Sequence, residues 1–179
     1  TTIATNDDDG ANADLSFSVD GSFDVTATSA SFSSDVTLGE AKSLNIGTPL
    51  LPTTDHTSTG LSAQMLAGGA IGAFQTVCIH STAGEVVVTD ANAAATMPVI
   101  GIAPAAISDT ATGTILLQGF IRDDTWNWTP GGILYASETA GAMTQTAPTT
   151  SGARVQAVGV ALSADVAYFN PALTLVEVD

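Results

Sequence analysis

The stretch "VIGIA", residues Val99 to Ala103, recurs as "AVGVA" at residues Ala157 to Ala161. A turn triplet, Thr82-Ala83-Gly84, recurs as Thr139-Ala140-Gly141, so the two offsets are 57 residues (139 − 82) and 58 residues (157 − 99). A nearly constant offset is typical of a duplicated supersecondary unit, although chance similarity between Ala-, Gly- and Val-rich strands is the alternative. Two units of short β-branched strands with glycine turns predict a β-barrel or β-sandwich module over residues 73–179.

The N-terminal part of the chain has a different pattern. From Leu15 to Leu38 apolar and polar residues alternate, which is the period of a half-buried strand, and Asp20-Gly21 is a strong hairpin turn. We expect residues 1–47 to form a β-rich segment for attachment or oligomerisation, because its Ser- and Thr-rich strands bury little apolar surface alone. Residues 48–72 contain two prolines and a Thr-rich run, which predicts a linker with a short helical turn between Gly60 and Gly72. The chain as a whole is expected to be all-β.

The charge of the chain excludes several classes of partner. Eighteen acidic residues stand against three basic ones, Lys42, Arg122 and Arg154, for a formal net charge of −15. Nucleic-acid binding depends on Lys and Arg side chains that neutralise phosphates, and three scattered cations cannot do this. The same argument excludes binding to anionic membrane surfaces, and no apolar run reaches the roughly 18 residues of a membrane span. We therefore predict neither a nucleic-acid nor a membrane partner.

The side chains that usually carry catalysis are few in this chain. His56 lies in the predicted linker and His80 follows a predicted strand just before a turn, and neither has a nucleophile in a recognisable motif. Cys78, the single cysteine, lies in the apolar run "FQTVCIH", where we expect a small core residue. We therefore predict no catalytic residue, no cofactor and no enzyme activity.

Acidic residues gather in two places. The run "NDDDGANAD", Asn6–Asp14, lacks the acids that an EF-hand loop needs at its first and twelfth positions, so we expect a solvated acidic segment there. Asp123 and Asp124 follow Arg122 directly, and neighbours along a strand point to opposite faces of the sheet. The two carboxylates are therefore not expected to work as a pair, and no metal site is predicted.

Both tryptophans of the chain lie in "DDTWNWTPGG", Asp123–Gly132. Trp126 and Trp128 are one residue apart and are expected to share one face of a strand, and the run from Thr129 to Gly132 is expected to form a tight turn. Such an aromatic pair forms either a sugar-binding platform or a packing surface, and we favour packing because no set of polar donors is evident nearby. Trp126 and Trp128 are thus the candidate binding or packing surface.

Three stretches carry a resemblance: "AAATMPVIGIA", "TGTILLQGFIRDDTWNWTPGGILYASETAGAMTQTAP" and "VQAVGVALSADVAYFNPALTLVE". Together they resemble the C-terminal module of tailed-bacteriophage structural proteins, which include head fibres, capsid decoration proteins and tail-fibre proteins. The resemblance extends from about Gly60 to Glu177, and its most specific piece is "DTWNWTPGG". It implies a β-rich, non-enzymatic component of the virion, usually a homotrimer.

Two functions follow from this resemblance. The first is a capsid decoration (cement) protein on the outer capsid surface, which binds the major capsid protein and copies of itself and so stabilises the shell. The shortness of the first 60 residues favours this function over a long fibre. The second is a tail-fibre or receptor-binding tip protein, whose Trp126/Trp128 face would bind a glycan receptor. Copy number in the virion would distinguish them.

Overall fold

The computed structural model describes residues 51–81 and 84–179, and within these ranges the chain is built from strands, as predicted. The segment 1–47, its hairpin at Asp20-Gly21 and the acidic run Asn6–Asp14 lie outside the described residues. One short 3-10 turn, η1 (Ala94–Thr96), interrupts the strands. The strands are β1 (Thr57–Leu66), β2 (Thr76–Ile79), β3 (Val86–Val88), β4 (Gly101–Ile102), β5 (Thr112–Arg122), β6 (Ile133–Ala136), β7 (Met143–Thr144), β8 (Arg154–Val155), β9 (Ala157–Ala161), β10 (Val166–Phe169) and β11 (Val176–Glu177).

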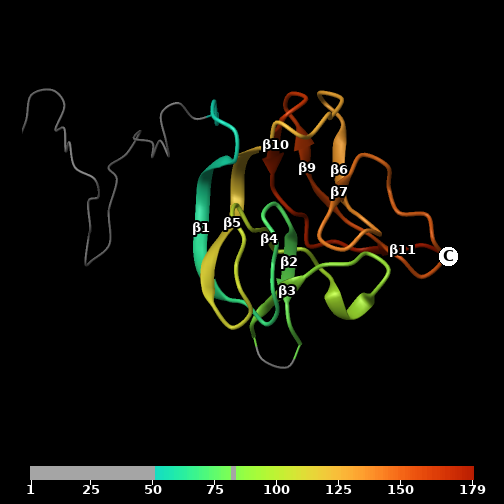
Figure 1. Cartoon of the computed structure of the whole chain (residues 1–179). Coiled ribbons are helices and arrows are strands. Elements are labelled where there is room, and N and C mark those ends of the chain that lie inside the picture. The colour runs from blue at the N-terminus through green and yellow to red at the C-terminus, as the bar shows by residue number, and fades with distance from the viewer. Residues whose placement is uncertain (1–50, 82–83) are drawn as a thin grey trace, which may run out of the picture. The chain divides into compact units, whose positions relative to one another are not determined.

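Nine of these strands form one antiparallel sheet that curls into a half-barrel (Figure 1). Its order is β3-β2-β4-β5-β10-β9-β6-β7, and β1 pairs with β5 outside this path. The long strand β5 therefore pairs with β1 along its whole length and with both β4 and β10. The strands β8 and β11 form a separate pair. Within the described ranges, no helix has the length and apolar character that a membrane span requires.

Two successive sets of strands have the same order of pairing. In the first set β2 pairs with β3 and β4, and β4 pairs with β5. In the second set β6 pairs with β7 and β9, and β9 pairs with β10. The repeated turn glycines, Gly84 and Gly141, have similar positive φ angles of 70° and 75°. These parallels agree with the predicted duplication, which itself stays a prediction.

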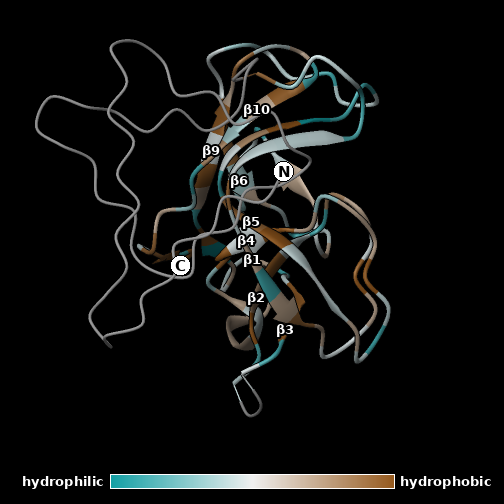
Figure 2. Cartoon of the chain, turned by 90° about the vertical axis from the view of Figure 1, so that its left-hand side faces the viewer, coloured by the Kyte–Doolittle hydropathy of each residue, from teal (hydrophilic) through white to brown (hydrophobic). Residues whose placement is uncertain are grey.

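The core lies on the concave side of the curled sheet, where alternate residues of the strands are buried. The paired residues Phe169 and Gly159, together with Leu134 on β6, show the pattern: all three are buried, because cross-strand partners project to one face. Figure 2 shows hydrophobic colouring along β9 and β10 in this part of the sheet. A second group of buried side chains forms the core at the other end of the sheet, around β2 and β3. It consists of Ala67, Ile71, Val77, Val86, Ala103, Ile107 and Ile115.

Facing glycines bring β1 and β5 unusually close. Gly60 pairs with Gly119, and both have positive φ angles, 142° and 155°. A Cβ atom on Gly119 would lie 2.0 Å from the backbone oxygen of Thr59, so no other residue fits here without a backbone shift. The register of the two strands shifts just beyond this point, between Leu61 and Ser62.

Part of the predicted linker at residues 48–72 is a strand, and the helical turn predicted within it is wrong. Residues Thr57–Leu66 form the ten-residue strand β1, and no helical turn occurs between Gly60 and Gly72. The reason is the partner: no residue of β1 is fully buried, and the pairing of β1 with β5 holds the strand extended. Leu61, Ala63 and Met65 alternate with polar residues, which is typical of a strand and was overlooked in the prediction.

Candidate functional site

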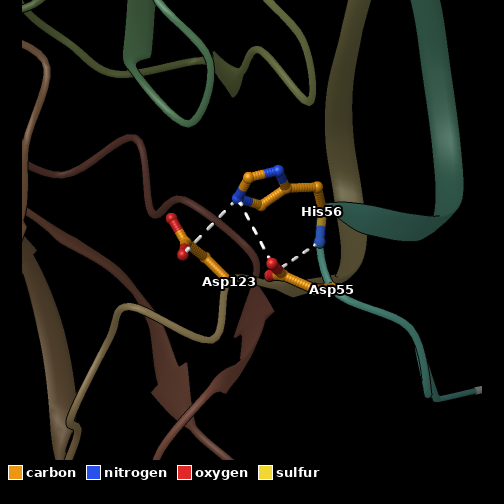
Figure 3. A group of neighbouring side chains, drawn as sticks. All are labelled: Asp55, His56 and Asp123. Carbon is orange, nitrogen blue, oxygen red and sulfur yellow. Dashed lines mark hydrogen bonds and ion pairs between the residues drawn. The ribbon is translucent and has the colours of Figure 1, made fainter.

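Three metal-ligating side chains meet where the chain enters β1 and leaves β5. His56 Nε2 lies 3.6 Å from Asp55 Oδ2 and 3.8 Å from Asp123 Oδ1 (Figure 3). The pairing of Thr57 with Arg122 places these segments side by side, because it joins the first residue of β1 to the last residue of β5. We call Asp55, His56 and Asp123 the Asp–His–Asp cluster.

Local hydrogen bonds hold both carboxylates of the cluster. Asp55 Oδ1 accepts hydrogen bonds from the backbone N–H groups of His56, at 2.9 Å, and Asp124, at 2.8 Å. Asp123 Oδ1 accepts from the backbone N–H of Thr125, at 2.8 Å, and from its hydroxyl, at 2.7 Å. His56 has a backbone φ of 57°, a conformation that costs free energy in a residue other than glycine. Its imidazole is directed toward Asp123, the residue that follows β5.

Exposure differs sharply within the cluster. The side chain of Asp123 is 10% exposed, whereas those of Asp55 and His56 are 42% and 59% exposed. The nearby guanidinium of Arg122 is directed to Asp124, with Nε 2.6 Å from Oδ1, and this hydrogen bond raises the pKa of Arg122. The imidazole of His56 is therefore the basic group that faces the buried Asp123 carboxylate.

An aromatic pocket adjoins the cluster. Phe74, Trp126 and Trp128 contribute their rings, and Asp123 contributes to the wall of a pocket of about 380 Å³. The centroids of the Phe74 and Trp126 rings are 5.7 Å apart, and those of Trp126 and Trp128 are 5.6 Å apart. The His56 ring lies 5.1 Å from that of Phe74, so the pocket and the cluster share a boundary.

The two tryptophans are close together, but not on a strand as predicted. The strand β5 ends at Arg122, and Asp123 forms a turn in which its carbonyl accepts from Trp126 N–H at 3.1 Å. Both rings are half-buried and pack against the main core, which is a packing role. The indole N–H of Trp128 is buried and has no hydrogen-bond partner among the described residues.

The tight turn after the tryptophans is confirmed. Gly132 N–H donates to Thr129 C=O at 3.1 Å, and Gly131 has φ = 79°. Pro130 occupies the position where its fixed φ suits the turn, and Gly131 occupies the one that needs positive φ. This turn leads directly into β6.

The other residues singled out from the sequence lie apart from the cluster. Cys78 is fully buried, as predicted, and burial raises the pKa of its thiol. His80 follows β2 just before a turn, also as predicted.

His56 is an exposed turn residue, but its contact with Asp123 was not predicted. Because β1 was predicted to be a linker, nothing in the sequence indicated that His56 and Asp123, which are far apart along the chain, lie close together.

An apolar strip crosses the convex face of the sheet. Phe120 on β5 pairs with Tyr168 on β10, which pairs with Val160 on β9, which pairs with Ile133 on β6. Paired residues project to the same face, so these four form one continuous line, the outer apolar row. Val160 and Ile133 are 40% and 47% exposed. A hollow of about 340 Å³ lies along part of the row, where it is lined by Phe120, Tyr168 and Val160 and completed by Leu162.

Comparisons with known proteins do not assign a family. No protein-family model matches the chain, and no curated protein matches it.

Proposed function

We propose that the chain is a virion structural protein, a capsid decoration protein that binds the outer surface of a phage head and stabilises it. The outer apolar row is the observation that supports this proposal most directly. It exposes uncharged, apolar side chains across four strands of a chain whose net charge is −15. Contiguous apolar surface of this kind is typical of a site of protein–protein contact.

We assign the outer apolar row to contact between copies of the chain, which form a homotrimer. Like charges repel over most of such an acidic surface, so copies can approach closely only where charge is lacking. Burial of Phe120, Val160 and Ile133 against a neighbour removes apolar area from water and drives association. The trimer then presents three equivalent surfaces to the major capsid protein, which suits a symmetric shell.

The proposal is tested by stoichiometry and mass. Hundreds of copies in a purified virion are expected for a decoration protein, and light scattering on the purified chain should give about three chain masses. Val160→Asp places a charge in the outer apolar row and should convert the trimer to a monomer. Leu173→Asp, at a residue that is 76% exposed and outside the row, should leave the trimer intact. A monomeric wild-type chain, or a trimer unaffected by Val160→Asp, would contradict the assignment.

The alternative function is that of a tail-fibre or receptor-binding tip protein, and the aromatic pocket favours it. A pocket of about 380 Å³ with three aromatic rings and a carboxylate has the composition of a sugar-binding site. A few copies per virion, and glycan binding that is lost in Trp126→Ala, would support this function over capsid decoration. Hundreds of copies without glycan binding would eliminate it.

A further inference from the structure

We propose that the Asp–His–Asp cluster binds one divalent transition-metal cation, with Zn²⁺ the best fit. The two measured separations, 3.6 Å and 3.8 Å, are too long for hydrogen bonds between these atoms. Ligands placed about 2.1 Å from a tetrahedral zinc ion lie about 3.4 Å from one another. All three ligand atoms lie within 4.8 Å of one another, so small side-chain movements bring them to an ion between them.

The ligand types favour a transition metal over calcium or magnesium. Imidazole nitrogen suits Zn²⁺ and its neighbours in the first transition series, whereas Ca²⁺ and Mg²⁺ select oxygen ligands. Three protein ligands leave at least one position of a tetrahedral ion for water, which the exposure of Asp55 and His56 permits. The Asp123 carboxylate supplies the buried side of the site.

The surroundings of the ligands match those of a metal site. Asp55 keeps Oδ1 on two backbone N–H groups, which leaves Oδ2 directed at the imidazole. Thr125 donates its N–H and its hydroxyl to Asp123 Oδ1, the oxygen nearest the imidazole, so Oδ2 is the Asp123 oxygen that remains for an ion. Such outer hydrogen bonds orient ligands and reduce the entropy that they lose on binding an ion.

Charge balance argues for the ion independently of these distances. Two carboxylates, one of them largely buried, face each other across a single imidazole. Arg122 lies close enough to Asp55 to attract it, but its guanidinium hydrogen-bonds Asp124 and also contacts Asp165. Arg154 Nη1 lies 2.9 Å from Glu177 Oε2. A divalent cation would compensate the two negative charges.

The bound ion would join the entry of β1 to the exit of β5. Asp55 and His56 directly precede β1, and Asp123 directly follows β5. This inference is independent of the proposed function, since it concerns a metal site and not adhesion.

The test is calorimetric titration of the chelator-treated, full-length chain with ZnCl₂. We expect one ion per chain, and at least a tenfold loss of affinity in His56→Gln and in Asp55→Asn, whose exposed side chains make misfolding of the variants a minor concern. His80→Gln is the matched control, because it removes the other imidazole and should bind as the wild type does. Asp123→Asn should behave like the first two variants where its circular dichroism matches that of the wild type.

Two further readouts make the result decisive. Zn²⁺ should raise the thermal midpoint of the wild type and of His80→Gln but not that of His56→Gln, and CaCl₂ should raise none of them. Lack of Zn²⁺ binding by the wild type would overturn the proposal. So would unchanged binding in both His56→Gln and Asp55→Asn, which would place the ion on other acidic groups of the chain.

Discussion

The side chain of Gln156 pairs with the backbone of Val99 as a strand would. Its Oε1 accepts from Val99 N–H at 2.7 Å, and its Nε2 donates to Val99 C=O at 2.9 Å and to Ala172 C=O at 2.5 Å. Gln156 is 1% exposed, so it satisfies the buried N–H and C=O of Val99, which water cannot reach. The bond joins the start of "VIGIA" to the residue that precedes "AVGVA", and so connects the two sets of strands.

Gln156→Ala should therefore destabilise the protein strongly. It leaves the buried N–H and C=O of Val99 without partners and opens a cavity, and we expect the free energy of unfolding to fall by about 3 kcal/mol. Denaturant unfolding followed by circular dichroism measures the change. Gln118→Ala is the control, because exposed Gln118 bonds only the Tyr168 hydroxyl across the sheet, and its effect should stay within about 0.5 kcal/mol.

The glycine pair between β1 and β5 predicts a second large effect. Gly119→Ala puts a Cβ atom onto the Thr59 carbonyl, so β1 must separate from β5, and we expect a loss of about 3 kcal/mol or more. Gly131→Ala has no atom within 4 Å of the new Cβ and should cost only the strain of its positive φ, about 1 kcal/mol. Equal midpoints of thermal unfolding for the two variants would show that the close approach is not required.

Glu138 predicts a pH-dependent contribution to stability. Its pKa is lowered because Thr150 donates from its N–H and hydroxyl and Thr149 from its N–H. A carboxyl whose pKa is lower in the folded state stabilises the protein above its unfolded pKa, and this contribution disappears as the pH falls through the folded pKa. The thermal midpoint of the wild type should exceed that of Glu138→Gln near pH 7, and the difference should close below about pH 4. A difference that is constant from pH 7 to pH 3 would contradict this assignment.

Cys78 should be unreactive in the folded protein. Burial raises the pKa of its thiol, and reagents such as iodoacetamide react with the thiolate. We expect mass spectrometry to show alkylation at neutral pH slowed at least a hundredfold relative to the chain in denaturant. A native rate equal to the denatured rate would mean that β2 opens readily.

Local features of the fold were predictable from the sequence, and features that depend on distant partners were not. The predicted turn at Pro130-Gly131 was confirmed, because the φ preferences of these two residues alone determine it. The strand β1 was missed because its first residues are polar, none of its residues is fully buried, and its pairing with the distant β5 holds it extended. The burial of Cys78 was predictable because its neighbours are apolar.

The Asp–His–Asp cluster depends on that missed pairing. Once Thr57 is known to oppose Arg122, the residues on either side, His56 and Asp123, must lie close together. Without this register, His56 is an isolated turn histidine and Asp123 is one of two adjacent acids. The prediction that the tryptophans lie on a strand was wrong for a related reason. The Asp123 carboxylate accepts hydrogen bonds from Thr125, and the strand that the alternation suggested ends there.

Because β5 pairs with strands of both sets, with β4 in the first and β10 in the second, neither set is complete alone. A chain cut in the tryptophan loop, at Asn127, would leave β1 to β5 on one fragment and β6 to β11 on the other. The first fragment would expose the edge of β5 that β10 normally covers, and the second would lose the strand on which β10 depends. The two fragments should therefore reassemble when they are co-expressed, which makes this loop a natural place to split the protein into complementing halves.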